Sequence, residues 1–146
     1  TEINLRTPAL LPDAYCPDVH ERLTLYKRLA NCESVDELDA LQEELIDRFG
    51  QLPLQGQSLL ATHRLRLLVQ PLCVQKLDAS ADQITLQFGP EFAKLAPIDP
   101  IRIINLIQKN RSYKLSGQDK ISLLRHCPTL NDKVAAVKDM IRQLSQ

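Results

Sequence analysis

Two stretches in the second half of the chain alternate apolar and polar residues: VQKLDAS at 74–80 and QITLQFG at 83–89. A period of two places the apolar side chains on one face of a β-strand. Only Ala81 and Asp82 separate the stretches, and so short a connection joins antiparallel strands. The pattern predicts a β-hairpin that needs an apolar partner on one face, which excludes an all-helical fold.

A second hairpin and two helices are predicted after the first. SYKLSG and KISLLRH meet at a turn around Gly117, and a helix is expected from about Asn131 to Leu144. Between the hairpins, Asp99–Pro100 begins another helix, because proline is favoured at the first helical position. The inner face of that helix is expected to carry Ile101, Ile104, Leu106 and Ile107. The order β-β-α-β-β-α predicts a small antiparallel sheet packed on helices.

The first half reads as an extended arm followed by three helices. Prolines at 8 and 12 keep residues 3–12 extended, as an arm or an edge strand. Helical spacing of apolar residues then predicts helices over about 18–30, 34–49 and 55–70. The fold class is therefore α+β. We expect residues 1–15 to form an arm or linker and residues 16–146 to form a single α+β domain.

The second of these helices carries strong end signals. Ser34 and Glu37 form a capping box, in which the hydroxyl accepts the Glu37 N–H and the carboxylate returns to the Ser34 N–H. Gly50 supplies the left-handed residue after the helix, and Pro53 directs the chain away. These three positions, Ser34, Gly50 and Pro53, are expected to have structural roles.

Acidic residues crowd this helix, with seven between Glu33 and Asp47 and no base among them. Glu44 and Asp47 are three residues apart, so their carboxylates are expected to lie side by side, opposite the apolar face. Such a pair is a good acceptor for an arginine fork from a partner. Glu43, Glu37 and Arg48 are possible supporting residues. A solvated helix face without a partner remains the alternative.

Charge and motifs limit the other classes of function. Acids and bases number 18 each, which speaks against a generic nucleic-acid binder. That alternative would use the bases Arg64, Arg66, Lys109, Arg111 and Lys114. Phosphate-binding loops and the G-x-S-x-G and H-E-x-x-H motifs are absent, so neither a small hydrolase nor a cofactor-dependent enzyme is expected. We predict a chain with no catalytic residues of its own.

Cysteine spacing and hydropathy indicate a cytoplasmic protein without metal. Cys16, Cys32, Cys73 and Cys127 form no C-x-x-C pair and lack ligand-like spacing to histidine, which favours reduced thiols. No apolar run is long enough to span a bilayer and no signal-peptide pattern opens the chain, so we expect no membrane contact.

Several of these stretches together resemble a known family. LLPDAY and PDVHERLTLYKRLANCESVDELDALQEELIDRFGQLP are similar to the C-terminal domain of the bacterial transcription-repair coupling factor (Mfd). The family pattern has a P-x-L-L-P-x-x-Y arm, then R-L-x-x-Y-K-R, S-x-x-E-L and E-L-x-D-R-F-G-x-L-P. It matches at Pro8–Tyr15, Arg22–Arg28, Ser34–Leu38 and Glu44–Pro53. The resemblance is close over residues 3–70 and looser beyond.

The resemblance implies a regulatory, autoinhibitory domain that follows a DNA-translocase motor and has no cofactor. Family members use an ATP-driven translocase to displace stalled RNA polymerase, and they recruit the excision-repair protein UvrA through an N-terminal UvrB-like module. The C-terminal domain is implied to dock on that module and hide its UvrA-binding surface. Glu44 and Asp47 fall where the family makes this contact, so they are expected to form a releasable clamp, without direct contact to nucleic acid.

Overall fold

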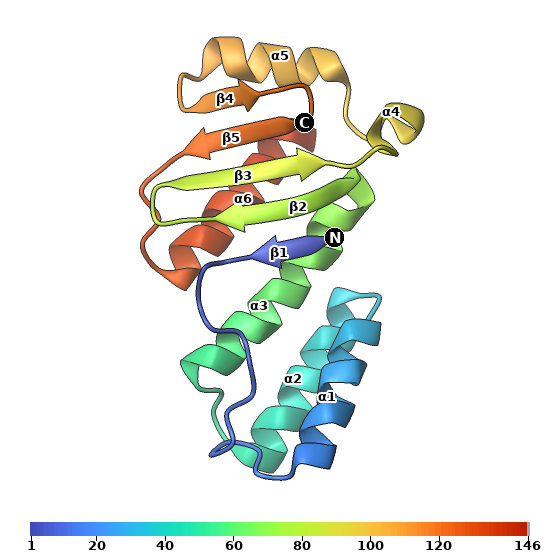
Figure 1. The fold of residues 1–146 in the computed structure, drawn as a ribbon, viewed down its shortest axis with the longest axis vertical. Helices are drawn as coiled ribbons and strands as arrows, with labels where there is room; N and C mark the ends of the chain where they lie inside the picture. Colours follow the sequence, from blue (N-terminus) through green and yellow to red (C-terminus); the bar gives the residue numbers. More distant parts are fainter. Residues whose placement is uncertain (146) are drawn as a thin grey trace. The chain divides into compact units, whose positions relative to one another are not determined.

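The computed structural model describes residues 1–145, which form two compact units (Figure 1). Thr7–Leu67 forms one, here called the helical unit. Residues 1–6 together with residues 68–145 form the other, here called the sheet unit. Each unit has its own buried core.

The helical unit contains the three helices expected from the sequence: α1 (Val19–Asn31), α2 (Val35–Phe49) and most of α3 (Leu54–Val69). Their apolar faces meet in one cluster of buried side chains, whose helical members include Leu25, Leu29, Leu38, Leu41, Leu45, Leu59 and Leu60. Leucines at helical spacing on each segment produce this core, because each helix buries one apolar stripe.

Hydrogen bonds fix the extended segment before α1 to these helices. The Leu11 N–H donates to the Tyr26 hydroxyl at 2.8 Å. The Tyr15 hydroxyl donates to the carbonyls of Leu45 at 3.1 Å and Gly50 at 2.8 Å, so it closes the C-terminal end of α2. Leu11 and Cys16 are buried in the same core.

The sheet unit is built on five strands in the order β1-β2-β3-β5-β4. They are β1 (Glu2–Asn4), β2 (Val74–Ala79), β3 (Gln83–Phe88), β4 (Tyr113–Ser116) and β5 (Lys120–Leu124). Both predicted hairpins are present and antiparallel. The sheet is nevertheless mixed rather than purely antiparallel, because β1 pairs in parallel with β2. A parallel pair needs a long crossover connection, and the helices between β1 and β2 provide it.

One long helix covers the sheet. α6 (Leu130–Ser145) buries Val137, Met140 and Leu144 in the core to which the strands contribute Leu77, Ile84, Leu86, Ile121 and Leu123. Lys133 of α6 is also buried, and its ammonium donates to the Leu5 carbonyl at 2.8 Å. Arg6 pairs with Asp78 through two 2.9 Å hydrogen bonds. These contacts hold the β1 segment within the unit.

A short 3-10 helix (Gln70–Leu72) precedes β2. The helices α4 (Phe92–Leu95) and α5 (Pro100–Lys109) lie between the two hairpins. The expected inner face of α5 was partly wrong. Ile103 is buried at 8% exposure, whereas Ile101 and Ile104 are 63% and 49% exposed. Apolar residues lie on both sides of this helix, so spacing alone did not decide which side is buried. Ile103, Leu106 and Ile107 face inward, and two isoleucines remain outside.

Candidate interaction surface on helix α2

Local signals at both ends define α2. The Ser34 hydroxyl accepts the Glu37 N–H at 3.2 Å, as the capping box predicts. The Glu37 carboxylate, however, accepts the Glu33 N–H at 2.8 Å instead of the Ser34 N–H, which is one residue further back than the capping box predicts. Gly50 has a φ of +93°, which favours glycine, and its N–H donates to the Ile46 carbonyl at 2.9 Å. Pro53 immediately precedes α3.

The buried face of α2 leaves the acids on the outside. Leu38, Leu41 and Leu45 are at most 4% exposed. The carboxylates of Asp36, Glu37, Glu43 and Asp47 belong to exposed residues, whereas Glu44 is half-buried. A single helix therefore presents a row of carboxylates to solvent, which we call the α2 acidic face.

Glu44 is bound within the unit by two arginines. Arg28 of α1 donates to both carboxylate oxygens, at 2.5 and 2.9 Å, and Arg48 approaches at 3.4 Å. The hydrogen bond from Arg28 lowers the pKa of the Glu44 carboxyl. Arg48 also pairs with Glu21 of α1 and lies 4.9 Å from the centre of the Phe49 ring. Arg48 thus pairs with Glu44 and also makes a second polar contact, with Glu21.

Glu44 and Asp47 are therefore not equivalent. Asp47 is exposed, and within residues 1–145 neither Asp47, Glu43 nor Asp36 has a basic side chain at ion-pair distance. Sequence reasoning missed the role of Arg28 as the partner of Glu44. The two residues are 16 apart and on different helices, so no local spacing indicates the pair.

A shallow recess lies beside this ion-pair network. Its volume is about 310 Å³, and Glu21, Arg28 and Arg48 line it together with His20, Thr24 and Leu25. Three of these residues also belong to the network around Glu44. A side chain that entered the recess would consequently meet the same arginines and acids.

The basic residues of the nucleic-acid alternative are partly engaged in internal contacts. Arg64 pairs with Asp39 and Gln42, each at 2.5 Å. Arg66 donates to the Cys32 carbonyl at 3.2 Å and to Nδ1 of His63 at 3.4 Å. His63 is half-buried, and that burial lowers its pKa. Lys109, Arg111 and Lys114 lie in the sheet unit and are exposed.

The described part of the chain meets neither the requirements of a metal site nor those of a membrane-spanning helix. Over residues 1–145, no three His, Cys, Asp or Glu side chains gather as a metal site would require. None of the helices in that range is long and apolar enough to cross a bilayer. The four cysteines are free thiols, and three of them are buried.

Comparison with known proteins identifies the family. The family model described as the TRCF domain matches residues 5–97, which include all of α2. The chain belongs to the TRCF family. The transcription-repair-coupling factor of Haemophilus influenzae is 41% identical over 145 residues, which is 99% of this chain. That of Escherichia coli K12 is 35% identical over 147 residues, and the aligned region covers the whole chain.

These TRCF relatives are much longer proteins, and the matched region is 12% of each. A solved structure supports the fold: the crystal structure of the C-terminal domain of a transcription-repair coupling factor superposes with a TM-score of 0.78. The match covers 98% of this chain and 90% of that one at 22% identity. The α+β architecture predicted from the sequence is confirmed.

Proposed function

We propose that this TRCF chain is a regulatory docking domain within a transcription-repair coupling factor. In the proposed role, the α2 acidic face binds basic residues of the UvrB-like N-terminal module and masks the surface to which UvrA binds. The parent protein would be an ATP-driven DNA translocase that displaces stalled RNA polymerase, and this chain would contribute no catalysis.

The observation that carries the proposal is the state of the carboxylates on α2. Asp36, Glu43 and Asp47 are exposed, and the described chain supplies them with no ion-pair partner. Aligned like charges on one helix are mildly unfavourable, so a basic partner would relieve a cost of a few tenths of a kcal/mol per pair. A complementary basic surface would also guide association and select the correct partner.

Glu44 adds a means of release. Its partner Arg28 is itself exposed, and an exposed ion pair contributes only about 0.2–1 kcal/mol. An arginine of the partner can replace Arg28 on the same carboxylate with little change in free energy. We therefore propose that docking exchanges one guanidinium for another, which keeps the contact reversible by a modest conformational change.

A competition assay tests masking. The isolated UvrB-like module is bound to UvrA, and the chain is added at increasing concentration. We expect wild type to displace UvrA and the double variant Glu44→Gln/Asp47→Asn to do so at least about tenfold less well, because two charge-assisted contacts are lost.

The matched control is Glu2→Gln/Glu91→Gln, which removes two exposed carboxylates from the sheet unit. This control is expected to compete like wild type. If wild type fails to displace UvrA, the masking role is wrong. Equal competition by both double variants would instead remove the α2 acidic face from the contact.

A further inference from the structure

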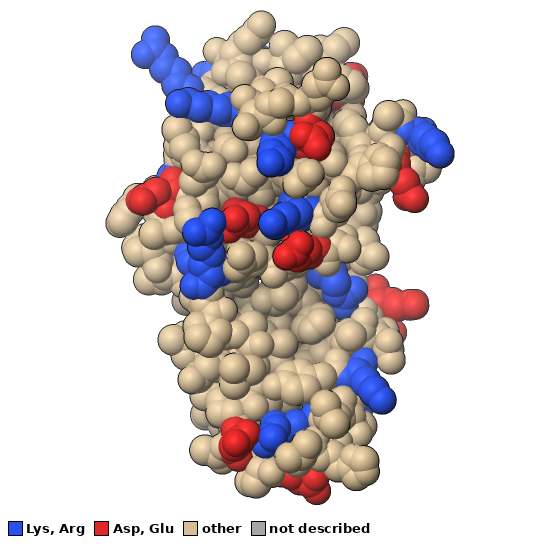
Figure 2. Space-filling model, in the orientation of Figure 1, with Lys and Arg blue, Asp and Glu red and all other residues tan. Residues whose placement is uncertain are grey.

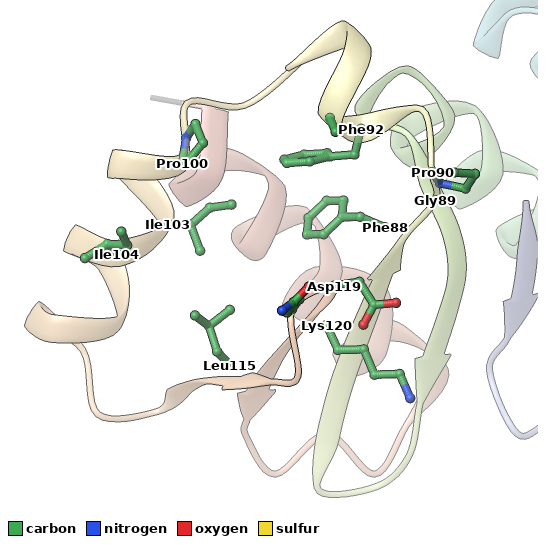
Figure 3. A pocket seen from close by; sticks show the side chains of 12 residues that line it. Phe88, Gly89, Pro90, Phe92, Pro100, Ile103, Ile104, Leu115, Asp119 and Lys120 are labelled. Atoms are coloured by element: carbon green, nitrogen blue, oxygen red, sulfur yellow. The ribbon is translucent and has the colours of Figure 1, made fainter.

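The sheet unit contains an apolar cavity of about 470 Å³ that has no part in the docking proposed above (Figure 3). It lies where β3 ends, between α4, α5 and the turn of the β4–β5 hairpin. Its apolar lining includes Phe88, Phe92, Pro100, Ile103, Ile104 and Leu115. We call it the α4–α5 pocket. Its volume falls in the range of about 300–1,000 Å³ that is typical of binding sites.

The inner wall of the pocket is formed by packed side chains. Phe88 is 7% exposed, and its ring centre lies 4.4 Å from that of Phe92. Ile103 is buried at 8% exposure. At the mouth, Ile104 and Leu115 are 49% and 51% exposed. These two side chains therefore have apolar surface that a bound partner would remove from water, which favours binding.

The segments that line the pocket carry more bases than acids. Residues 89–120 contain six bases and three acids, Glu91, Asp99 and Asp119, and five of the bases lie in residues 100–120. Asp119 accepts a hydrogen bond from the Gln87 amide at 3.3 Å. In the described chain no acid lies at ion-pair distance from any of the five, which are Arg102, Lys109, Arg111, Lys114 and Lys120. Figure 2 shows lysine and arginine side chains projecting at the upper left, beside the end of α5 and the start of β4.

We propose that the α4–α5 pocket binds an apolar anchor side chain presented by an acidic amphipathic helix of a protein partner. The apolar wall receives the anchor, and the unpaired bases of α5 and the β4–β5 hairpin attract the acids that flank it. Single-stranded nucleic acid, which stacks its bases on exposed aromatic side chains, suits this site poorly, because Phe88 is 7% exposed and packs against Phe92.

The test uses two synthetic helical peptides of about four turns each. Both carry leucines at i, i+3, i+4 and i+7, but one has glutamate and the other lysine at its polar positions. Each peptide is titrated into the chain with isotope-labelled isoleucine and leucine methyl groups. We expect the acidic peptide to shift the methyl resonances of Ile103, Ile104 and Leu115, and the basic peptide to shift none of them.

Two isoleucines of α5 supply a matched pair of variants. Ile104→Glu places a negative charge at the mouth of the pocket. We expect it to lower the affinity of the chain for the acidic peptide about tenfold or more. Ile101→Glu adds the same charge to the same helix at a residue that does not line the pocket, and it is expected to change the affinity much less. Leu115→Gln, which adds no charge, provides a second disruption should Ile104→Glu fail to fold.

Several outcomes would overturn the proposal. These are absence of methyl shifts with the acidic peptide, equal binding of the two peptides, or equal loss of affinity in both isoleucine variants. A DNA duplex that shifts the pocket methyls more strongly than the acidic peptide would assign the site to nucleic acid. Methyl shifts that depend on the concentration of the chain alone would assign it to a second copy.

Discussion

The two units carry opposite charge, although the chain as a whole is neutral. The helical unit contains ten acids and six bases, and the sheet unit contains eight acids and twelve bases. Equal totals over the chain therefore do not describe either surface. The comparison shows that electrostatic arguments about partners must be made for each compact unit rather than for the whole sequence.

The units also differ in how their charges are paired. In the helical unit, Arg22, Arg28, Arg48 and Arg64 each pair with an acid, and exposed carboxylates on α2 remain unpaired. In the sheet unit the five bases of residues 100–120 make no such pair in the described chain, and one of them, Lys120, lines the apolar pocket together with Asp119. Each unit thus presents the charge that it holds in excess. We expect the helical unit to prefer basic partners and the sheet unit to prefer acidic ones.

The strongest test of two separate cores compares one leucine from each. Leu45→Ala and Leu86→Ala each remove a fully buried side chain, and we expect each to lower the free energy of unfolding by about 2–5 kcal/mol. Amide exchange should accelerate most in the helical unit for Leu45→Ala and most in the sheet unit for Leu86→Ala. The same acceleration throughout both units for both variants would contradict the division.

The next largest effect is expected for the buried lysine of the sheet unit. Lys133→Met leaves the Leu5 carbonyl without its 2.8 Å donor, so we expect a loss of about 1–3 kcal/mol in urea unfolding and faster amide exchange in β1. Lys138→Met, on the exposed side of the same helix, is the control and should change stability by less than about 0.5 kcal/mol. Equal effects of the two variants would show that the contact does not hold β1.

A smaller effect is expected on the pH dependence of the free energy of unfolding, through His63 of the helical unit. Burial lowers the pKa of His63 in the helical unit, so below about pH 6.5 the unfolded chain binds a proton more readily than the folded chain does. Stability should therefore fall as the pH drops through this range and level off below the folded pKa. His63→Gln should remove that part of the slope in denaturation curves recorded at several pH values. An unchanged slope would show that His63 is not the titrating group.

The smallest effect is expected at Tyr113 in the sheet unit. Its hydroxyl is buried without a hydrogen-bond partner in the described structure, and burial raises its pKa. Tyr113→Phe should leave the free energy of unfolding within about 0.5 kcal/mol of wild type, or raise it slightly, because no bond is lost. A thermal scan measures this directly. A loss above about 1 kcal/mol would mean that the hydroxyl has a partner, such as a bound water.

Local signals explain why much of the fold could be predicted. The Ser34 cap, Gly50 and the leucines of α2 act within one helix. The short connection between β2 and β3, three residues in the structure rather than the two expected, leaves the first hairpin little choice of topology. Pairing between β1 and β2 joins residues more than 70 apart, so local patterns identify an edge strand but not its direction. On α5, apolar residues on both sides made the buried face ambiguous.

At the candidate site, too, some features follow from local spacing and others depend on how separate segments pack. Helical spacing predicts that the acids of α2 lie opposite its leucines, and the structure places them there. The partner of Glu44 depends on how α1 packs against α2, and the spacing of residues within α2 does not predict that packing. The α4–α5 pocket likewise combines residues of three separate segments.

Calorimetric titration of the UvrB-like module with wild type, Asp47→Asn and Arg28→Gln tests the docking proposal most directly. Asp47→Asn should weaken binding, because a free carboxylate is lost. Arg28→Gln should strengthen binding by up to about fivefold, since it removes the internal competitor for Glu44 at the cost of one exposed ion pair. Unchanged affinity for Asp47→Asn, or weaker binding for Arg28→Gln, would contradict the exchange of guanidinium groups on the α2 acidic face.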